Sequence, residues 1–173
     1  MQIFRGLGDY KFGFKKPENY VFKSKKGISD KVVADISWHK NEPTWMRDFR
    51  LRSYAIFLNK KMPTWGGDLS HINFNDIYYY IKPTQKTVTS WEDLPPEIKD
   101  TYDRIGIPEA EKKYLAGVSA QYESEFIYKS IQKELDKQGV IFLGMDAGLR
   151  EYPDLVRKYF STIIPPADNK FSA

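Results

Sequence analysis

The sequence predicts an α+β fold: a mainly helical amino-terminal part is followed by a small strand–helix–strand unit and a further helix. Residues 28–62 carry apolar side chains at helical spacing in two successive runs. Residues 116–128 alternate with a period of two, which is typical of a strand. A charged helical pattern and a short apolar run at 140–144 follow, so the chain permits a compact βαβ unit. At 173 residues and 41% hydrophobic content, the chain is long and apolar enough to bury a substantial core.

The first predicted helix begins near residue 29. Ser29 or Asp30 can serve as its N-cap, because both side chains offer an oxygen to the free N–H groups of a first turn. Val32, Val33 and Ile36 then fall on one face of the helix. We therefore expect this face of the helix to pack against another part of the protein.

The second predicted helix runs from about Thr44 to Lys60. Residues 41–43 precede it, and we expect the side-chain oxygen of Asn41 or Glu42 to cap its first turn, which the fixed φ of a proline suits. Apolar side chains occupy two opposite sides of this helix. One side carries Trp45, Met46, Phe49, Ile56 and Phe57, and the other carries Leu51, Tyr54, Ala55 and Leu58. We therefore expect the helix to lie at the centre of the domain or between the domain and a partner.

Residues 63–83 are rich in Gly, Pro, Asn and Asp and predict a loop with a short extended segment at 77–81. This segment contains Tyr78, Tyr79 and Tyr80. Three successive rings could stack on nucleic-acid bases, or they could cover a neighbouring helix or a subunit interface, and we favour the second interpretation. The three tyrosines are therefore candidate partner-docking residues.

Residues 84–94 predict a polar linker, after which two prolines at 95 and 96 begin a short helix that ends at Gly106. Pro108 begins a second short helix, which ends near Gly117. A helix over residues 129–138 follows the alternating strand, and Gly139 suits the position just after its end.

The carboxyl-terminal part predicts a helix capped by Asp146 and restarted at Pro153. Its apolar face carries Leu155, Val156, Tyr159 and Phe160, and Ile163, Ile164 and Phe171 follow. This apolar surface exceeds what the last residues can cover, and the tail has no closing element. We therefore expect a docking surface here, and Leu155, Tyr159, Phe160 and Phe171 are its candidate residues.

The basic character of the chain lies at its start. Residues 1–27 carry seven basic and two acidic side chains, whereas the remainder is nearly neutral. We predict a basic extended arm over 1–27 and a single α+β domain over 28–173. Interleaved aromatic rings would allow such an arm to bind single-stranded nucleic acid. We favour a solvated arm, because runs of charge usually face solvent.

No catalytic, metal or cofactor site is expected on this chain. It has no cysteine, so disulfides and thiolate ligation of zinc or an iron–sulfur cluster are excluded. Its two histidines are far apart, and no phosphate-binding glycine loop or nucleophile elbow occurs. No apolar run approaches the ~20 residues that span a bilayer, and no signal peptide is evident. We expect a non-enzymatic protein in the cytoplasm, or in a plastid or other organelle, with no membrane partner. The alternative is a basic and aromatic module that binds single-stranded nucleic acid, and we favour the interpretation without nucleic acid.

Several runs closely resemble one protein family. They are YKFGF, GISDKVVADIS, KNEPTWMRDFRLRSY, INFNDIYYYIKPTQK, DRIGIPEAEKKYLAGV, QGVIF and YPDLVRKYFSTIIPPADNKFSA, which together cover almost the whole chain. In this order and approximate spacing they resemble the amino-terminal domain of SufB, the scaffold subunit of the SUF iron–sulfur cluster assembly system.

The resemblance implies a role in protein–protein docking within a complex of SufB, the related subunit SufD and the ATPase SufC. It implies an iron–sulfur cluster, and ATP through SufC, for the full complex. The cluster-handling residues of the family lie in later regions, so none is carried over to a position here. The resemblance also implies that this chain ends where the family's β-helix begins, and that the β-helix is a partner of the docking surface.

Overall fold

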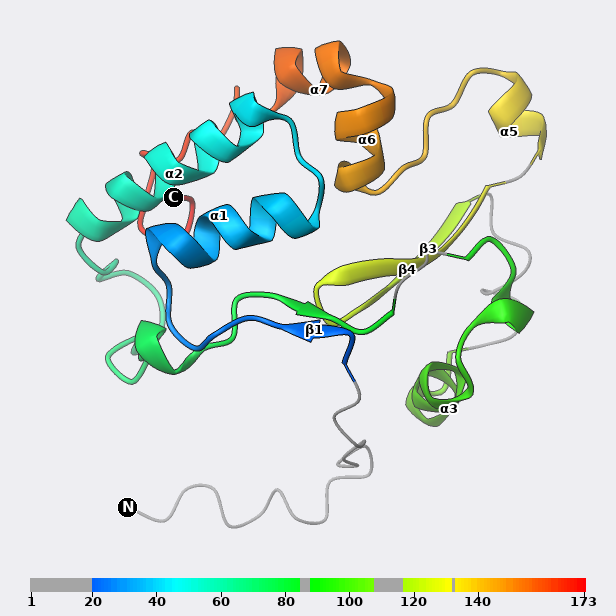
Figure 1. Cartoon of the computed structure of the whole chain (residues 1–173), viewed down its shortest axis with the longest axis horizontal. Coiled ribbons are helices and arrows are strands. Elements are labelled where there is room, and N and C mark those ends of the chain that lie inside the picture. The colour runs from blue at the N-terminus through cyan, green and yellow to red at the C-terminus, as the bar shows by residue number, and fades with distance from the viewer. Residues whose placement is uncertain (1–19, 85–87, 108–116, 132) are drawn as a thin grey trace. The chain divides into compact units, whose positions relative to one another are not determined.

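The computed structural model describes residues 20–84, 88–107, 117–131 and 133–173 (Figure 1). It has an α+β fold in which helices predominate, as predicted. The described residues divide into two compact units. Among these residues, unit 1 comprises 20–22, 82–84, 88–107, 117–131 and 133–142, and unit 2 comprises 23–81 and 143–173. The division into an arm over 1–27 and one domain over 28–173 stays a prediction, because most of the arm lies outside the described residues.

Helix α1 of unit 2 spans Asp30–His39 and begins as its sequence predicts. The Ser29 hydroxyl accepts a hydrogen bond from the backbone N–H of Val32 at 3.2 Å, which satisfies one free donor of the first turn. Val32 and Val33 are buried. The predicted apolar face of α1 is therefore a packed face.

Helix α2 spans Thr44–Asn59 and packs against α1. Pro43 is its N-cap and no side chain caps its first turn, so the prediction of an Asn41 or Glu42 cap is wrong. Glu42 binds an arginine of α2 instead. Ala55 and Leu58, on the second apolar side, are exposed. A central position for α2 is therefore wrong for this structure, whereas a partner on its second side stays a prediction.

The segment after α2 contains the 3₁₀ helix η2 (Phe74–Asp76) and strand β2 (Ile81–Lys82). Strand β2 pairs with strand β1 (Phe22–Lys23), which confirms the extended segment predicted near 77–81. Within unit 2, the backbone N–H of Ser24 donates to the carbonyl of Tyr80 at 2.9 Å. The pairing brings Tyr80 into the core of unit 2, where it is 1% exposed.

Two short helices, α6 (Met145–Glu151) and α7 (Pro153–Tyr159), continue unit 2. Pro153 starts α7 as predicted, because its fixed φ suits a first turn. The predicted Asp146 cap is wrong, since Gly144 is the N-cap of α6. The Asp146 carboxylate instead accepts a hydrogen bond from the Lys40 ammonium at 2.8 Å, next to the end of α1.

The core of unit 1 gathers residues from four segments. Its buried members are Trp91, Leu94, Ile98, Ala120, Ile127 and Tyr128. Two of them come from residues 84–94, where the 3₁₀ helix η3 (Trp91–Asp93) forms, so the prediction of a polar linker there is wrong. Helix α3 (Pro96–Ile105) follows, and Gly106 ends it at φ 85°, a conformation that favours glycine.

Strands β3 (Gly117–Tyr122) and β4 (Glu125–Ile131) form an antiparallel hairpin where one long strand was predicted. The prediction was wrong because the turn at 123–124 lacks Gly, Pro or Asn, and Glu123 adopts φ 54°. Helix α5 is correspondingly short, Lys133–Lys137. Residues 140–144 form no strand, so the predicted βαβ unit is also wrong. The helix predicted after Pro108 lies outside the described residues.

Candidate functional site

An ion pair joins the turn after α1 to the middle of α2. The Arg50 guanidinium donates two hydrogen bonds to the Glu42 carboxylate, from Nε to Oε2 at 2.7 Å and from Nη2 to Oε1 at 2.6 Å. The Glu42 side chain is 1% exposed. Bidentate geometry of this kind orients both groups strongly. The pair therefore holds the two helices at their connection.

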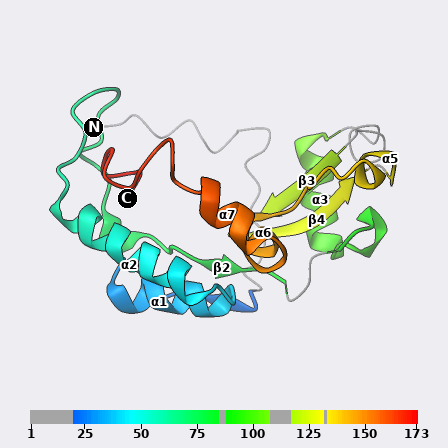
Figure 2. The same ribbon diagram turned by 90° about the horizontal axis from the view of Figure 1, so that it is seen from above.

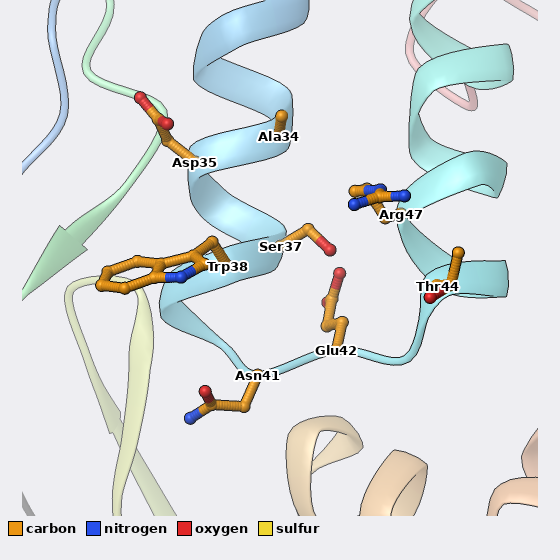
Figure 3. A pocket seen from close by; sticks show the side chains of 8 residues that line it. All are labelled: Ala34, Asp35, Ser37, Trp38, Asn41, Glu42, Thr44 and Arg47. Atoms are coloured by element: carbon orange, nitrogen blue, oxygen red, sulfur yellow. The ribbon is translucent and has the colours of Figure 1, made fainter.

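An open pocket of about 550 Å³ lies beside this connection (Figure 3). Its lining residues are Ala34, Asp35, Ser37, Trp38, Asn41, Glu42, Thr44 and Arg47. Ser37, Glu42 and Arg47 point into the space between α1 and α2, and Trp38 extends away to one side (Figure 3). Among the described residues, no group of three His, Cys, Asp or Glu side chains could hold a metal ion.

The structure separates the three predicted docking tyrosines. Tyr78 is exposed, and the Lys23 ammonium lies 4.1 Å from its ring centroid. Tyr79 is partly buried, its hydroxyl donates to the Phe74 carbonyl at 3.0 Å, and burial raises its pKa. Tyr80 is buried, so of these three rings Tyr78 offers the most surface to a partner. The buried and bonded neighbours do not form a stacking platform for bases.

A cation cluster surrounds Tyr78. The Lys26 ammonium lies 5.4 Å from the same ring and also forms an ion pair with Asp76. The hydrogen bond and the charge of Asp76 raise the pKa of Lys26. These contacts join the segment that carries Lys23 and Lys26 to the 3₁₀ helix η2 and to Tyr78, which follows it.

The predicted docking residues of α7 and the tail differ in exposure. Leu155, Tyr159 and Phe171 are exposed, whereas Phe160 packs edge-on against Phe49 of α2, with ring centroids 5.2 Å apart. Ile163 and Ile164, which follow Phe160, are 90% and 64% exposed. Ile163 exposes the largest fraction of its surface among the large apolar side chains of the described residues. Exposed apolar side chains therefore continue beyond the end of α7.

The tail has a closing contact that the sequence did not predict. It runs back alongside α2 (Figures 1 and 2), where the Lys170 ammonium donates to the carbonyls of Phe57 and Lys60 at 2.6 and 2.9 Å. The same ammonium lies 3.9 Å from the Phe57 ring centroid. A cation at the carboxyl end of a helix stabilises its last carbonyls, and the Phe57 carbonyl also accepts from the backbone N–H of Lys60 at 3.3 Å. No local sequence signal pairs Lys170 with a helix end more than a hundred residues earlier.

No helix of the described residues is long and apolar enough to cross a membrane. No protein-family model matches the chain, and no solved structure matches it either.

Curated relatives do match. Two proteins of Staphylococcus aureus, from strains USA300 and N315, are 53% identical over 167 residues, or 96% of this chain. A protein of Staphylococcus haemolyticus (strain JCSC1435) is 52% identical over the same share. All three are described as iron–sulfur cluster assembly SufBD family proteins. The chain spans 36% of the length of each. Over nearly all of its residues, this chain is therefore homologous to part of the iron–sulfur cluster assembly SufBD family proteins.

Proposed function

We propose that this chain is a segment of an iron–sulfur cluster assembly protein of the SufBD family, and more specifically of a SufB-like scaffold subunit. The observation that carries the proposal is the 53% identity over 96% of the chain. The SufB-like assignment rests on the runs NEPTWM and FRLRSY and on the carboxyl-terminal run from YPDLVRKYF onwards.

Within such a protein, this segment acts by docking and not by chemistry. Its sequence has no cysteine to bind a cluster, and the cluster belongs to the full complex. Exposed Leu155, Tyr159 and Ile163 supply apolar surface for contacts. The partners of the full-length protein are a SufC-like ATPase and a SufD-like subunit. The cytoplasm is the proposed location.

A segment exchange tests this function. In a Staphylococcus aureus strain depleted of its own relative, the aligned segment of that relative is replaced by this chain. We expect the chimera to restore the activity of a cluster-dependent enzyme such as aconitase, measured in extracts. A deletion of the same segment is the negative control, and immunoblotting verifies equal abundance. A chimera that is as abundant as the native protein but restores no more activity than the deletion would refute the proposal.

Co-purification tests the docking role. We expect the chimera to retain SufC- and SufD-like proteins on an affinity column, and the deletion variant to lose at least one of them. Equal retention by both would show that this segment contributes nothing to assembly of the complex.

A further inference from the structure

Residues 161–168 form a loop, here called the pinned loop, that lies between two attachments to α2. We propose that the pinned loop inserts Ile163 and Ile164 into an apolar groove on the remaining part of the same polypeptide. This inference rests on the proposal that the chain is a segment of a longer SufBD family protein.

Both ends of the pinned loop are held by α2. Phe160 precedes the loop and packs edge-on against Phe49, at a centroid distance of 5.2 Å. Lys170 follows the loop and donates to two carbonyls at the other end of the helix. Phe171 adds a contact with Phe74, with ring centroids 6.2 Å apart. The loop therefore has defined start and end points on one rigid element.

The chain between the two attachments is longer than their spacing on the helix. Phe49 and Phe57 are eight residues apart on a helix, which places them only ~12 Å apart along its axis. The ten residues from Phe160 to Lys170 could span ~33 Å if extended. The segment is therefore much longer than a direct path along the helix requires, and within it Ile163 and Ile164 are 90% and 64% exposed.

Hydrogen bonds within the segment hold the pinned loop in one conformation. The Ser161 hydroxyl donates to the Ile164 carbonyl at 3.0 Å, and the Thr162 hydroxyl donates to the Tyr159 carbonyl at 2.9 Å. The N–H of Asp168 donates to the Pro165 carbonyl at 3.0 Å, and two successive prolines restrict the backbone between these bonds. A preorganised loop loses little entropy when it binds. Two isoleucines presented in this way suit insertion into a preformed apolar groove.

The size of the patch and the length of the relatives identify the occupant. Burial of the two isoleucine side chains by themselves supports roughly millimolar affinity, so insertion of this loop alone suits a covalently linked neighbour and not a separate protein at micromolar concentration. A second copy of the chain would need about 800 Å² per partner, far more than two side chains supply. A covalently linked neighbour has an effective concentration of about millimolar order. The relatives offer such a neighbour, because this chain spans 36% of their length.

Photo-cross-linking in the chimera described above tests the inference. p-Benzoylphenylalanine replaces Ile163, and a matched chimera carries it in place of Trp65, which is exposed on another loop of unit 2. We expect irradiation at position 163 to join the loop to a peptide outside the exchanged segment of the same polypeptide, without a dimer band on a denaturing gel. Position 65 should give at least about fivefold less of this product.

Two charge substitutions sharpen the test. Ile164→Lys should reduce the product from position 163 at least about fivefold, whereas Ala167→Lys, which adds the same charge at an exposed position of the same loop, should leave it unchanged. A cross-link to a second copy or to another protein would overturn the proposed occupant. Absence of any product in a chimera with native thermal stability would overturn the docking itself.

The aconitase activity of the chimera tests the proposed function separately from the cross-link. An inactive chimera with the expected cross-link would remove the proposed function and leave the docking. An active chimera without that cross-link would support the proposed function and remove the proposed docking of the pinned loop.

Discussion

Arg50 closes the connection between α1 and α2 by donating two hydrogen bonds, at 2.7 and 2.6 Å, to the Glu42 carboxylate. The carboxylate is almost fully enclosed, whereas the arginine keeps about a third of its surface, with exposed fractions of 1% and 36%. The buried Glu42 carboxylate therefore depends on Arg50, because a buried carboxylate without a partner lowers the stability of the folded state.

Arg50→Met should lower the free energy of unfolding by about 2 kcal/mol. This is less than the ~3–5 kcal/mol for a fully buried pair, because Arg50 is partly exposed. Urea unfolding followed by circular dichroism at 222 nm measures the loss. Arg52→Met, at an exposed position of the same helix, is the control and should change stability little. Equal effects of the two substitutions would show that the pair contributes no stability.

Lys170→Met should loosen the carboxyl end of α2. The variant loses a charged donor to the carbonyls of Phe57 and Lys60, which we expect to cost about 1–2 kcal/mol. Hydrogen exchange should become faster for the amides of residues 57–60 and for those of the tail. Lys61→Met, at an exposed position, serves as the comparison. Unchanged exchange at 57–60 in Lys170→Met would mean that the tail does not cap the helix in solution.

Met46→Ala should destabilise the protein more than Trp45→Ala does. Met46 is among the largest fully buried side chains, and its truncation leaves a cavity that costs about 2–5 kcal/mol. Trp45 is only partly buried, and the Arg157 guanidinium lies 5.9 Å from its ring centroid. Midpoints of urea unfolding compare the two variants directly. A larger loss from Trp45→Ala would place the tryptophan, and not Met46, at the packed centre of unit 2.

Tyr102 should make unit 1 sensitive to alkaline pH. Burial, followed by the proximity of Tyr122, raises the pKa of its phenol above the ordinary value of 10.0. A raised pKa in the folded state means that the contribution of Tyr102 is complete below pH ~10 and is lost as pH rises through the folded pKa. Tyr102→Phe should therefore flatten the decline of unfolding free energy between pH 9 and 12. A decline as steep as in the unchanged protein would exclude Tyr102 as its source.

Anaerobic incubation of this chain with iron and sulfide should leave no stable cluster. The chain offers no thiolate ligand and only two histidines, which are 32 positions apart as His39 and His71. Visible absorbance and iron content are measured after desalting, with a cysteine-ligated ferredoxin as the positive control. A stoichiometric chromophore that survives desalting would contradict the expectation.

The sequence predicts elements well where their boundaries depend on neighbouring residues. Ser29 caps α1, and Gly106 ends α3 in the left-handed conformation that glycine allows. The hairpin of β3 and β4 was not predicted, because no Gly, Pro or Asn at or beside its turn signals a turn. Glu123 adopts a positive φ of 54° without a residue type that signals a turn, and the alternation of side chains continues across it.

The candidate site was only partly predictable. The apolar run from Leu155 to Phe171 marks a surface, but the sequence alone does not distinguish Phe160, which packs on α2, from Ile163, which stays exposed. Tyr80 was expected on a docking surface and is buried by the pairing of its strand segment with Ser24. In each case exposure depends on which distant segment covers the residue.

By itself, then, the sequence determined the α+β class, the positions of α1, α2, α3 and α7, and the absence of thiolate chemistry, because caps, prolines, helical periodicity and residue types act locally. Only the tertiary structure decided that Glu42 pairs with Arg50 instead of capping α2, and that Lys170 fastens the tail to that helix. These choices join residues separated by 8 and by more than 100 positions. They follow from burial and hydrogen bonding between segments that meet only after the chain has folded.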